Sequence, residues 1–373
     1  MNKIFIIYDH FFDAFGENIT IGGIQTYIKC LCEVSLKVGC HPIVVQYADI
    51  DYYKKYNRTE IYGIKDDKSG KRRIQAVRKC EELGDVNNDI LIFASYIFNT
   101  KTMFKKTISI QHGISWDIPI YSRGIFSIPQ LLRRFISIYG VISKINRTRV
   151  VVCVDYNFIN WYRTIIRCFK NNFYIIPNFS RIPESKRDNN NTSKKIIKIL
   201  FARRLWFYRG TRLFADAIEV LSNDNDNLFF TIAGEGPDEQ YLKDKLGSYK
   251  NVEFTSYESD KSLEIHSQFD IAVVPTLGSE GTSLSLLEAM ATGCAVIASN
   301  VGGMTNIIID GFNGQLINPD VDSLCSAIRK LAYDDDYRQM ISKNAVSTIE
   351  SGFSYEKWEK SWIRIINLLN EDK

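Results

Sequence analysis

Residues 196–233 read IIKILFARRLWFYRGTRLFADAIEVLSNDNDNLFFTIA, and this stretch decides the fold class. The apolar runs Ile196–Phe201 and Leu228–Ala233 indicate buried strands, and Thr211–Leu221 between them has apolar residues at helical spacing. Two buried strands joined by a helix are typical of a parallel strand–helix–strand unit. The stretch therefore predicts an α/β fold with a parallel sheet and crossover helices.

The same alternation of strand-like and helix-like segments runs along both halves of the chain. Further helices are expected from Gly22-Gly23 to about Val38 and over Glu239–Leu246, Ser283–Thr292 and Ser354–Leu369. Further strands are expected at Lys3–Tyr8, Pro42–Gln46, Asp89–Ala94, Thr107–Ile110, Val150–Val154, Tyr174–Ile176, Val252–Thr255, Ile271–Val274 and Ala295–Ala298. The polar, aperiodic stretch Arg181–Ser193 is the expected linker. We expect two Rossmann-like, doubly wound domains facing each other across a cleft, with any ligand at the carboxyl ends of the strands.

The composition excludes several classes of protein. Of the 373 residues, 45% are apolar and 24% are charged, which excludes a disordered chain. No apolar run reaches the ~18 residues of a spanning helix, and the run before Asp9 is too short for a signal peptide. The eight cysteines form no CxxC pair or metal-ligand spacing, so we expect reduced, buried thiols in a cytosolic protein.

Positive charge is concentrated in the first half of the chain. Residues 1–180 carry a net charge of +10 and the remainder −6, although the whole chain has only +4. The basic half could face nucleic acid, an anionic membrane or an anionic lipid-linked substrate, or it could be a solvated surface of uneven charge. No nucleic-acid recognition motif accompanies it, so no nucleic-acid partner is expected.

Two glutamates, Glu280 and Glu288, lie eight positions apart in the segment EGTSLSLLEAMAT. If a helix begins near Thr282 or Ser283, eight steps of about 100° place the two carboxylates within reach of one crevice. Gly281, Thr282 and Ser283 would then offer N–H groups at a helix N-terminus, where phosphate binds. Two surface glutamates at this spacing are also common. The surrounding motifs favour sugar hydroxyls on the carboxylates and a diphosphate on the amides.

Three arginines, Arg203, Arg204 and Arg209, follow the strand expected at Ile196–Phe201. A strand end that leads into a helix is where an α/β domain binds anions, and planar guanidinium groups suit phosphate oxygens. Glycine turns follow the next expected strands, in IAGEGPD and at Gly302-Gly303.

Taken in order, RRLWFYRG, AGEGP, EGTSLSLLEAMATG, GGMTN and GQLINP resemble the carboxyl-terminal half of family-4 retaining glycosyltransferases of the GT-B fold. The resemblance is strong over residues 196–332, and IGGIQTY, QHGI and IIPNF match landmarks of the first half. It implies an acceptor-binding domain over residues 1–180, completed by a C-terminal helix at 355–373. It also implies a donor-binding domain over residues 181–354, as in bacterial surface-polysaccharide glycosyltransferases.

The resemblance implies roles for individual residues. Arg204 and Arg209 would neutralise the donor diphosphate, and Arg209 replaces the family's usual lysine. Glu280 would contact the donor sugar, Glu288 would hold the ribose, and His112 occupies the position of the family's active-site histidine. The remaining donor contacts would come from Gly22, Gly23, Gly281, Thr282, Ser283 and Leu284.

Three sites depart from the family pattern. Thr282 and Ser283 replace the Phe and Gly of EGFG, Asn306 replaces the Glu of GG-x-x-E, and Arg203 stands at the first Gly of GRL. The donor-sugar pocket is therefore expected to be more polar. The phosphate-binding residues are retained, and the donor could be UDP- or GDP-linked.

The implied reaction moves a sugar from a nucleotide sugar to an acceptor hydroxyl with retention of configuration. Arginines and amides can stabilise the leaving diphosphate, so neither a metal nor a cofactor is expected. Asp49-Ile50-Asp51 spells a DxD motif, but it is far from the donor motifs. No carboxylate stands out as a covalent nucleophile, which favours a front-face mechanism. A GT-B-fold epimerase and a catalytically silent nucleotide-sugar-binding partner subunit are the alternatives.

Residues 118–150 interleave apolar side chains with six basic ones and resemble an interfacial helix with a basic rim. Together with the +10 charge, this indicates docking on an anionic inner-membrane surface. The acceptor would then be a glycan or a polyprenyl-diphosphate-linked glycan of O-antigen or capsule synthesis. An ordinary amphipathic helix packed on the sheet is the alternative. The expected location is the cytoplasm, either free or peripheral on the inner face of the plasma membrane.

Overall fold

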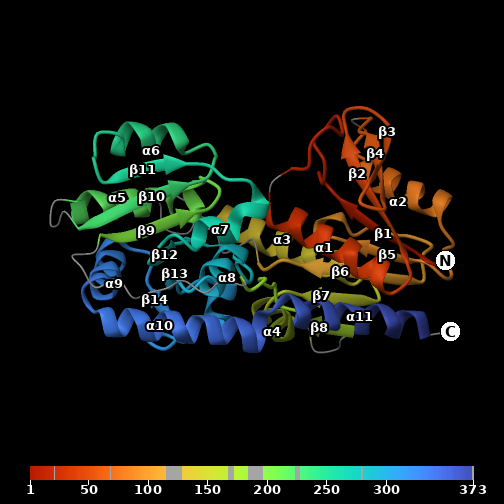
Figure 1. Cartoon of the computed structure of the whole chain (residues 1–373). Helices are drawn as coiled ribbons and strands as arrows, with labels where there is room; N and C mark the ends of the chain where they lie inside the picture. The colour runs from red at the N-terminus through yellow and green to blue at the C-terminus, as the bar shows by residue number, and fades with distance from the viewer. Residues whose placement is uncertain are drawn as a thin grey trace. The chain divides into compact units, whose positions relative to one another are not determined.

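The computed structural model describes residues 1–20, 22–67, 69–114, 128–166, 172–183, 196–222, 227–278 and 280–371. The chain divides into two compact units (Figure 1). Unit 1 comprises Met1–His112, Ser122–Ile176 and Trp358–Lys373, and unit 2 comprises Gly113–Tyr121 and Pro177–Lys357.

Within the described residues, unit 1 has one eight-stranded sheet in the order β3-β4-β2-β1-β5-β6-β7-β8. Its strands are β1 (Lys3–Tyr8), β2 (His41–Ala48), β3 (Tyr52–Tyr56), β4 (Thr59–Lys65), β5 (Ile90–Phe93), β6 (Lys106–Gln111), β7 (Val150–Cys153) and β8 (Asn172–Ile175). Every pair is parallel except β3 with β4. Because β1 lies between β2 and β5, the winding direction of the sheet reverses beside β1.

The helices of unit 1 connect these strands. They are α1 (Gly23–Lys37), α2 (Arg72–Leu83), the short η1 (Tyr96–Phe98), α3 (Ile128–Ile145) and α4 (Tyr156–Ile165). The helix α11 (Tyr355–Glu371) joins unit 1 from Trp358 onward. There the buried Trp362 donates a hydrogen bond from Nε1 to the Tyr27 hydroxyl of α1 at 2.8 Å.

Unit 2 has a six-stranded parallel sheet in the order β11-β10-β9-β12-β13-β14, counted over the described residues. Its strands are β9 (Ile197–Ala202), β10 (Leu228–Ala233), β11 (Val252–Thr255), β12 (Ile271–Val274), β13 (Ala295–Ser299) and β14 (Gln315–Ile317). Its helical segments are η2 (Phe207–Arg209), α5 (Thr211–Ser222), α6 (Glu239–Leu246), η3 (Ser259–Lys261), α7 (Ser262–His266), α8 (Leu284–Ala291), η4 (Gly302–Asn306), α9 (Val321–Tyr333), α10 (Asp335–Thr348) and η5 (Ile349–Phe353).

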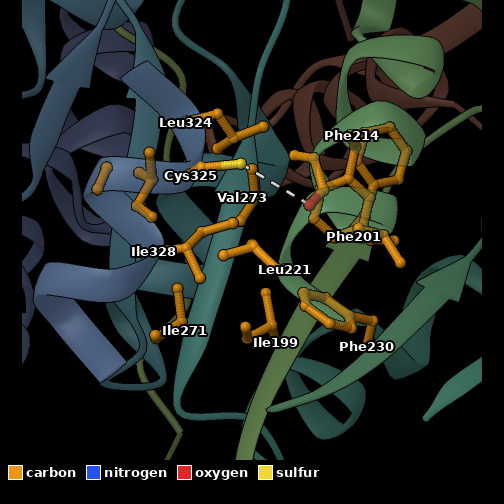
Figure 2. Packing of buried hydrophobic residues seen from close by; sticks show 14 of the residues in the cluster. Ile199, Phe201, Phe214, Leu221, Phe230, Ile271, Val273, Leu324, Cys325 and Ile328 are labelled. Carbon is orange, nitrogen blue, oxygen red and sulfur yellow. Dashed lines mark hydrogen bonds between the residues drawn. The ribbon is translucent and has the colours of Figure 1, made fainter. Parts of the chain in front are cut away.

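Side chains alternate across the unit 2 sheet, so each face has its own core. On one face Ile199, Phe201 and Phe230 pack against residues of α5 and α9, such as Phe214 and Ile328 (Figure 2). The other face buries a second cluster, which includes Leu200, Ala202, Val274, Leu286, Leu287, Met290 and Ala345. Helices therefore cover both faces of the sheet.

The expectation of two parallel-sheet α/β units is confirmed, but the β3–β4 hairpin was missed. The DxD segment forms the turn that leads into this hairpin, and Asp51 Oδ1 accepts a hydrogen bond from the Lys65 N–H at 2.9 Å. Residues 184–193 of the expected linker and residues 118–127 of the expected interfacial segment lie outside the described residues.

Two further expectations concern the cysteines and the absence of membrane-spanning segments. The seven cysteines among them are buried, and none of these seven forms a disulfide. No helix in the described ranges combines the length and the apolar character that a membrane crossing requires.

Candidate functional site

The candidate site of unit 2 lies where the strand order reverses, between β9 and β12. Arg203 directly follows β9, and the loop after β12 carries Thr276 and Glu280. A backbone hydrogen bond from Leu277 N to Tyr208 O, at 2.8 Å, ties this loop to η2 and so places Arg209 beside it. Parallel α/β sheets bind ligands at such reversal points.

Glu280 is the centre of a buried polar cluster. Arg203 Nη2 donates to Glu280 Oε2 at 2.6 Å, Arg209 Nη1 donates to the same oxygen, and Thr276 Oγ1 donates to it at 3.1 Å. Arg203 Nη1 also donates to Thr276 Oγ1. The side chains of Arg203 and Glu280 are 5% and 9% exposed, whereas that of Arg209 is 26% exposed.

The two guanidinium groups keep the Glu280 carboxylate ionised. Burial alone would raise the pKa of Glu280, but the charges and hydrogen bonds of Arg203 and Arg209 outweigh it and lower the pKa to about 2. Within the described residues, every hydrogen bond to this carboxylate ends on Oε2. Oε1 accepts none of these three hydrogen bonds.

Glycine backbone brings the loops of the site together. Gly302 has φ +54, and a Cβ there would lie 2.2 Å from Glu280 O. The next residue, Gly303, donates its N–H to Glu280 O at 2.8 Å. Gly234 has φ +145, and a Cβ there would lie 2.1 Å from Arg203 O. The two glycine turns noted in the sequence thus set the backbone of Glu280 and Arg203.

The helix α8 begins at Leu284, four residues after Glu280. Ser283 is the N-cap residue, and its side chain makes no capping hydrogen bond, so the first N–H groups of α8 depend on other partners. Thr282 is fixed by Asn178, whose backbone N donates to Thr282 Oγ1 at 2.9 Å and whose Nδ2 donates to Thr282 O at 2.6 Å. Thr282 therefore anchors this loop.

Glu288 lies on α8 and has a different environment from Glu280. Ser262 Oγ donates to Glu288 Oε2 at 2.6 Å. Burial raises the pKa of Glu288 to about 7, and the Ser262 hydrogen bond only partly opposes this shift. Glu288 can therefore be neutral or ionised near neutral pH.

Unit 1 carries three of the predicted residues, His112, Gly22 and Gly23. His112 follows β6, and its Nε2 lies 2.8 Å from Ala94 O. A carbonyl oxygen only accepts, so Nε2 carries the proton and Nδ1 is an acceptor in the neutral ring. Burial lowers the pKa of His112 to about 4, which keeps the ring neutral. Gly22 is the N-cap residue of α1, and Gly23 is its first residue.

The structure therefore brings Glu280 and Arg209 together in unit 2 but pairs them with Arg203. Arg204 is exposed, and the guanidinium that reaches Glu280 beside Arg209 belongs to its neighbour. Sequence reasoning counted Arg203 in the anion-binding arginine cluster after the strand but gave it no contact with Glu280, and it did not single out Thr276 or Asn178. A charged residue directly after a buried strand was the available signal for Arg203.

The described part of the chain holds no group of three or more His, Cys, Asp or Glu side chains placed to bind a metal ion. Metal independence itself stays a prediction.

Residues 183–348 match the family model described as "Glycosyl transferases group 1". An uncharacterized glycosyltransferase of Methanocaldococcus jannaschii is 30% identical over 181 residues, which are 47% of this chain and 46% of that protein. The UDP-Gal:alpha-D-GlcNAc-diphosphoundecaprenol alpha-1,3-galactosyltransferase of Escherichia coli is 30% identical over 161 residues, 41% of each chain. The chain thus spans a little under half the length of these curated relatives.

The whole chain resembles solved structures. Sucrose-phosphate synthase from Thermosynechococcus elongatus matches with a TM-score of 0.79 at 16% identity, covering 99% of both chains. A likeness at this identity shows the fold, which is the GT-B type with two parallel-sheet α/β domains. The chain has the GT-B fold, and within it residues 183–348 match group 1 glycosyl transferases.

Proposed function

We propose that the protein is a retaining glycosyltransferase that moves a sugar from a nucleoside-diphosphate sugar to an acceptor hydroxyl. The observation that carries the proposal is the Glu280 cluster, in which two guanidinium groups and an ionised carboxylate meet at the reversal point of unit 2. The family match over residues 183–348, which includes this cluster, supports the same conclusion.

The donor would be held mainly by unit 2. Arg204, Arg209 and the first N–H groups of α8, at Ser283 and Leu284, would bind the diphosphate, because cations and helix N-termini both attract phosphate. Glu280 Oε1 and the Gly281 amide would contact the sugar, and Glu288 would hold the ribose. Gly22, Gly23 and His112 of unit 1 are proposed as further donor contacts. The relative that uses UDP-Gal favours a UDP-linked donor.

The proposed reaction follows a front-face path without a metal ion. The acceptor oxygen attacks the anomeric carbon on the face from which the diphosphate departs, and the acceptor proton passes to the leaving phosphate oxygen. Negative charge grows on the diphosphate as the bond between the anomeric carbon and the phosphate oxygen breaks. Arg209 together with the α8 amides would stabilise this charge. Neutral His112 presents Nδ1 as a hydrogen-bond acceptor for a sugar hydroxyl.

Ligand-induced thermal stabilisation tests the donor assignment. We expect UDP or GDP to raise the Tm of the unmodified protein, since a ligand at a hundred times its Kd adds about 2.7 kcal/mol. Arg209→Ala should remove most of the shift. Arg212→Ala should not, because Arg212 is an exposed cation that pairs with Asp238 at 3.3 Å. Absence of a shift with every nucleotide and nucleotide sugar would contradict the proposed function.

The acceptor is proposed to be a polyprenyl-diphosphate-linked glycan of bacterial surface-polysaccharide synthesis, reached from the inner membrane surface. The diphosphoundecaprenol acceptor named for the Escherichia coli relative supports this. So does α3, on which Leu132, Phe135, Ile136 and Tyr139 are 60–74% exposed. Their spacing of three and four residues places them on one helix face, and an exposed apolar face of this kind suits an interface.

Vesicle flotation tests the membrane proposal. We expect the protein to float with phosphatidylglycerol-containing vesicles at low salt, and the double substitution Leu132→Ser, Phe135→Ser to reduce the bound fraction several-fold. Ile309→Ser is the matched control, because Ile309 is an equally exposed apolar residue outside α3. If the unmodified protein stays with the unbound fraction, the acceptor must be reached without membrane docking.

A further inference from the structure

Arg203 occupies the position at which the resembling enzymes have the first glycine of GRL. Its guanidinium is buried, with 5% of the side chain exposed, and bonds both Thr276 Oγ1 and Glu280 Oε2. Arg203 N also donates to Ala233 O at 3.0 Å, so its backbone is fixed by the neighbouring β10. The structure thus adds a second cation to a glutamate that Arg209 already binds.

The two arginines differ in their freedom to leave Glu280. Arg209 is 26% exposed, lies in the short η2 and has its guanidinium carbon 5.0 Å from the Tyr208 ring centroid. Arg203 has two buried polar partners and five times less exposure. A diphosphate at the site would therefore attract Arg209, the more accessible cation, while Arg203 keeps its position.

We propose that Arg203 is a positioning residue that serves as the permanent counter-ion of Glu280 and thereby frees Arg209 to bind the donor diphosphate. This inference rests on the proposed function. Arg203 itself need not touch the donor. It keeps the carboxylate ionised and its Oε1 oriented while Arg209 changes partner.

The physical reason is the cost of an unpaired buried charge. A buried carboxylate without a cation becomes protonated, because burial raises its pKa. With Arg203 present, Glu280 stays ionised whether or not Arg209 is engaged. Without it, transfer of Arg209 to a diphosphate leaves Glu280 with no cation, so nucleotide binding must be accompanied by proton uptake.

Other titratable groups near Glu280 do not obscure its proton uptake on nucleotide binding. Glu280 faces Arg203, Arg209 and, through them, Tyr208 of η2. Tyr257 is coupled electrostatically to both Glu288 and Arg203, and burial keeps it neutral by raising its pKa. The titration of Glu288 and of the nucleotide phosphates is common to the unmodified protein and its variants, so their difference isolates Glu280.

The experiment measures the UDP affinity of the unmodified protein, Arg203→Gly and Arg203→Lys from pH 5 to 7. Calorimetry in two buffers of different ionisation enthalpy counts the protons taken up; GDP replaces UDP if only GDP binds. As the pH rises, we expect the ratio of the Arg203→Gly Kd to the unmodified Kd to grow by up to about tenfold per pH unit. Arg203→Gly should also take up as much as one more proton per UDP bound than the unmodified protein. Arg203→Lys should restore a flat ratio, because it keeps the charge.

Each outcome decides a different point. No UDP or GDP binding by the unmodified protein overturns the proposed function. Equal pH dependence and proton uptake in the unmodified protein and Arg203→Gly overturn the role of Arg203 alone. If circular dichroism shows that Arg203→Gly is unfolded, Arg203→Gln replaces it, since glutamine can still bond Thr276 but carries no charge, and the same two results are decisive.

Discussion

Arg209→Ala is expected to lower kcat/KM for nucleotide-sugar turnover by about 10²–10³-fold, the effect of removing one donor to a developing negative charge. Arg209 is the most exposed member of the Glu280 cluster and is proposed to bind the diphosphate. Its loss leaves Glu280 paired with Arg203, so folding should be preserved. The rate is measured as release of nucleoside diphosphate from the nucleotide sugar that stabilises the protein most.

Two companion variants sharpen this result. Arg209→Lys should retain much of the activity, because a lysine supplies the charge although it lacks the planar fork of donors. Arg212→Ala should leave the rate within about twofold, since its partner is Asp238 at the start of α6. Equal rates for Arg209→Ala and the unmodified enzyme would exclude Arg209 from diphosphate binding.

Glu280→Ala is expected to lower the free energy of unfolding by about 3–5 kcal/mol, because it leaves a buried guanidinium without its counter-ion. Arg203, with 5% of its side chain exposed, bears most of this cost. Chemical denaturation of the full chain gives the measurement. The control is Glu258→Ala, which removes an exposed ion pair to Lys261 at 3.9 Å and should cost less than about 1 kcal/mol.

The Glu280 contribution should also depend on pH in a defined direction. The folded pKa of about 2 lies below the ordinary value of 4.5, so this stabilisation is complete above pH 4.5. It is lost as the pH falls from 4.5 towards 2, by about 3 kcal/mol in total. The Glu280→Ala variant should not show this part of the loss of stability at low pH. Parallel stability curves for the two proteins over this range would show that the carboxylate is not paired in solution.

The fold was predictable because the strands are uninterrupted apolar runs between helices with clear periodicity. The bounds of β1, β10, β11 and β12 match the expectation residue for residue. The β3–β4 hairpin was not predicted because β3 (YYKKY) lies at the sheet edge and alternates exposed with partly buried residues. An edge strand without fully buried residues has only a weak hydrophobic pattern in its sequence.

The sequence predicted most of the residues of the site, but it did not predict which arginines pair with Glu280. Spacing alone placed Glu280 beside the start of α8, and the glycine turns indicated close backbone approaches. Which of two adjacent arginines turns inward depends on the direction in which the chain leaves β9. That direction is set by backbone contacts to Ala233, the last residue of β10, and to Gly234 directly after it, which no local pattern records.

The shared helix α11 has a consequence for the order in which the protein matures on the ribosome. Unit 1 draws its core from both ends of the chain, because Trp362 must bond Tyr27. Unit 2, apart from Gly113–Tyr121, is one continuous stretch from Pro177 to Lys357. The later-translated unit can thus complete its core first, while the earlier-translated unit must wait for Trp362, which lies 335 positions after its partner Tyr27. Nascent-chain proteolysis should show protection of unit 2 before that of unit 1.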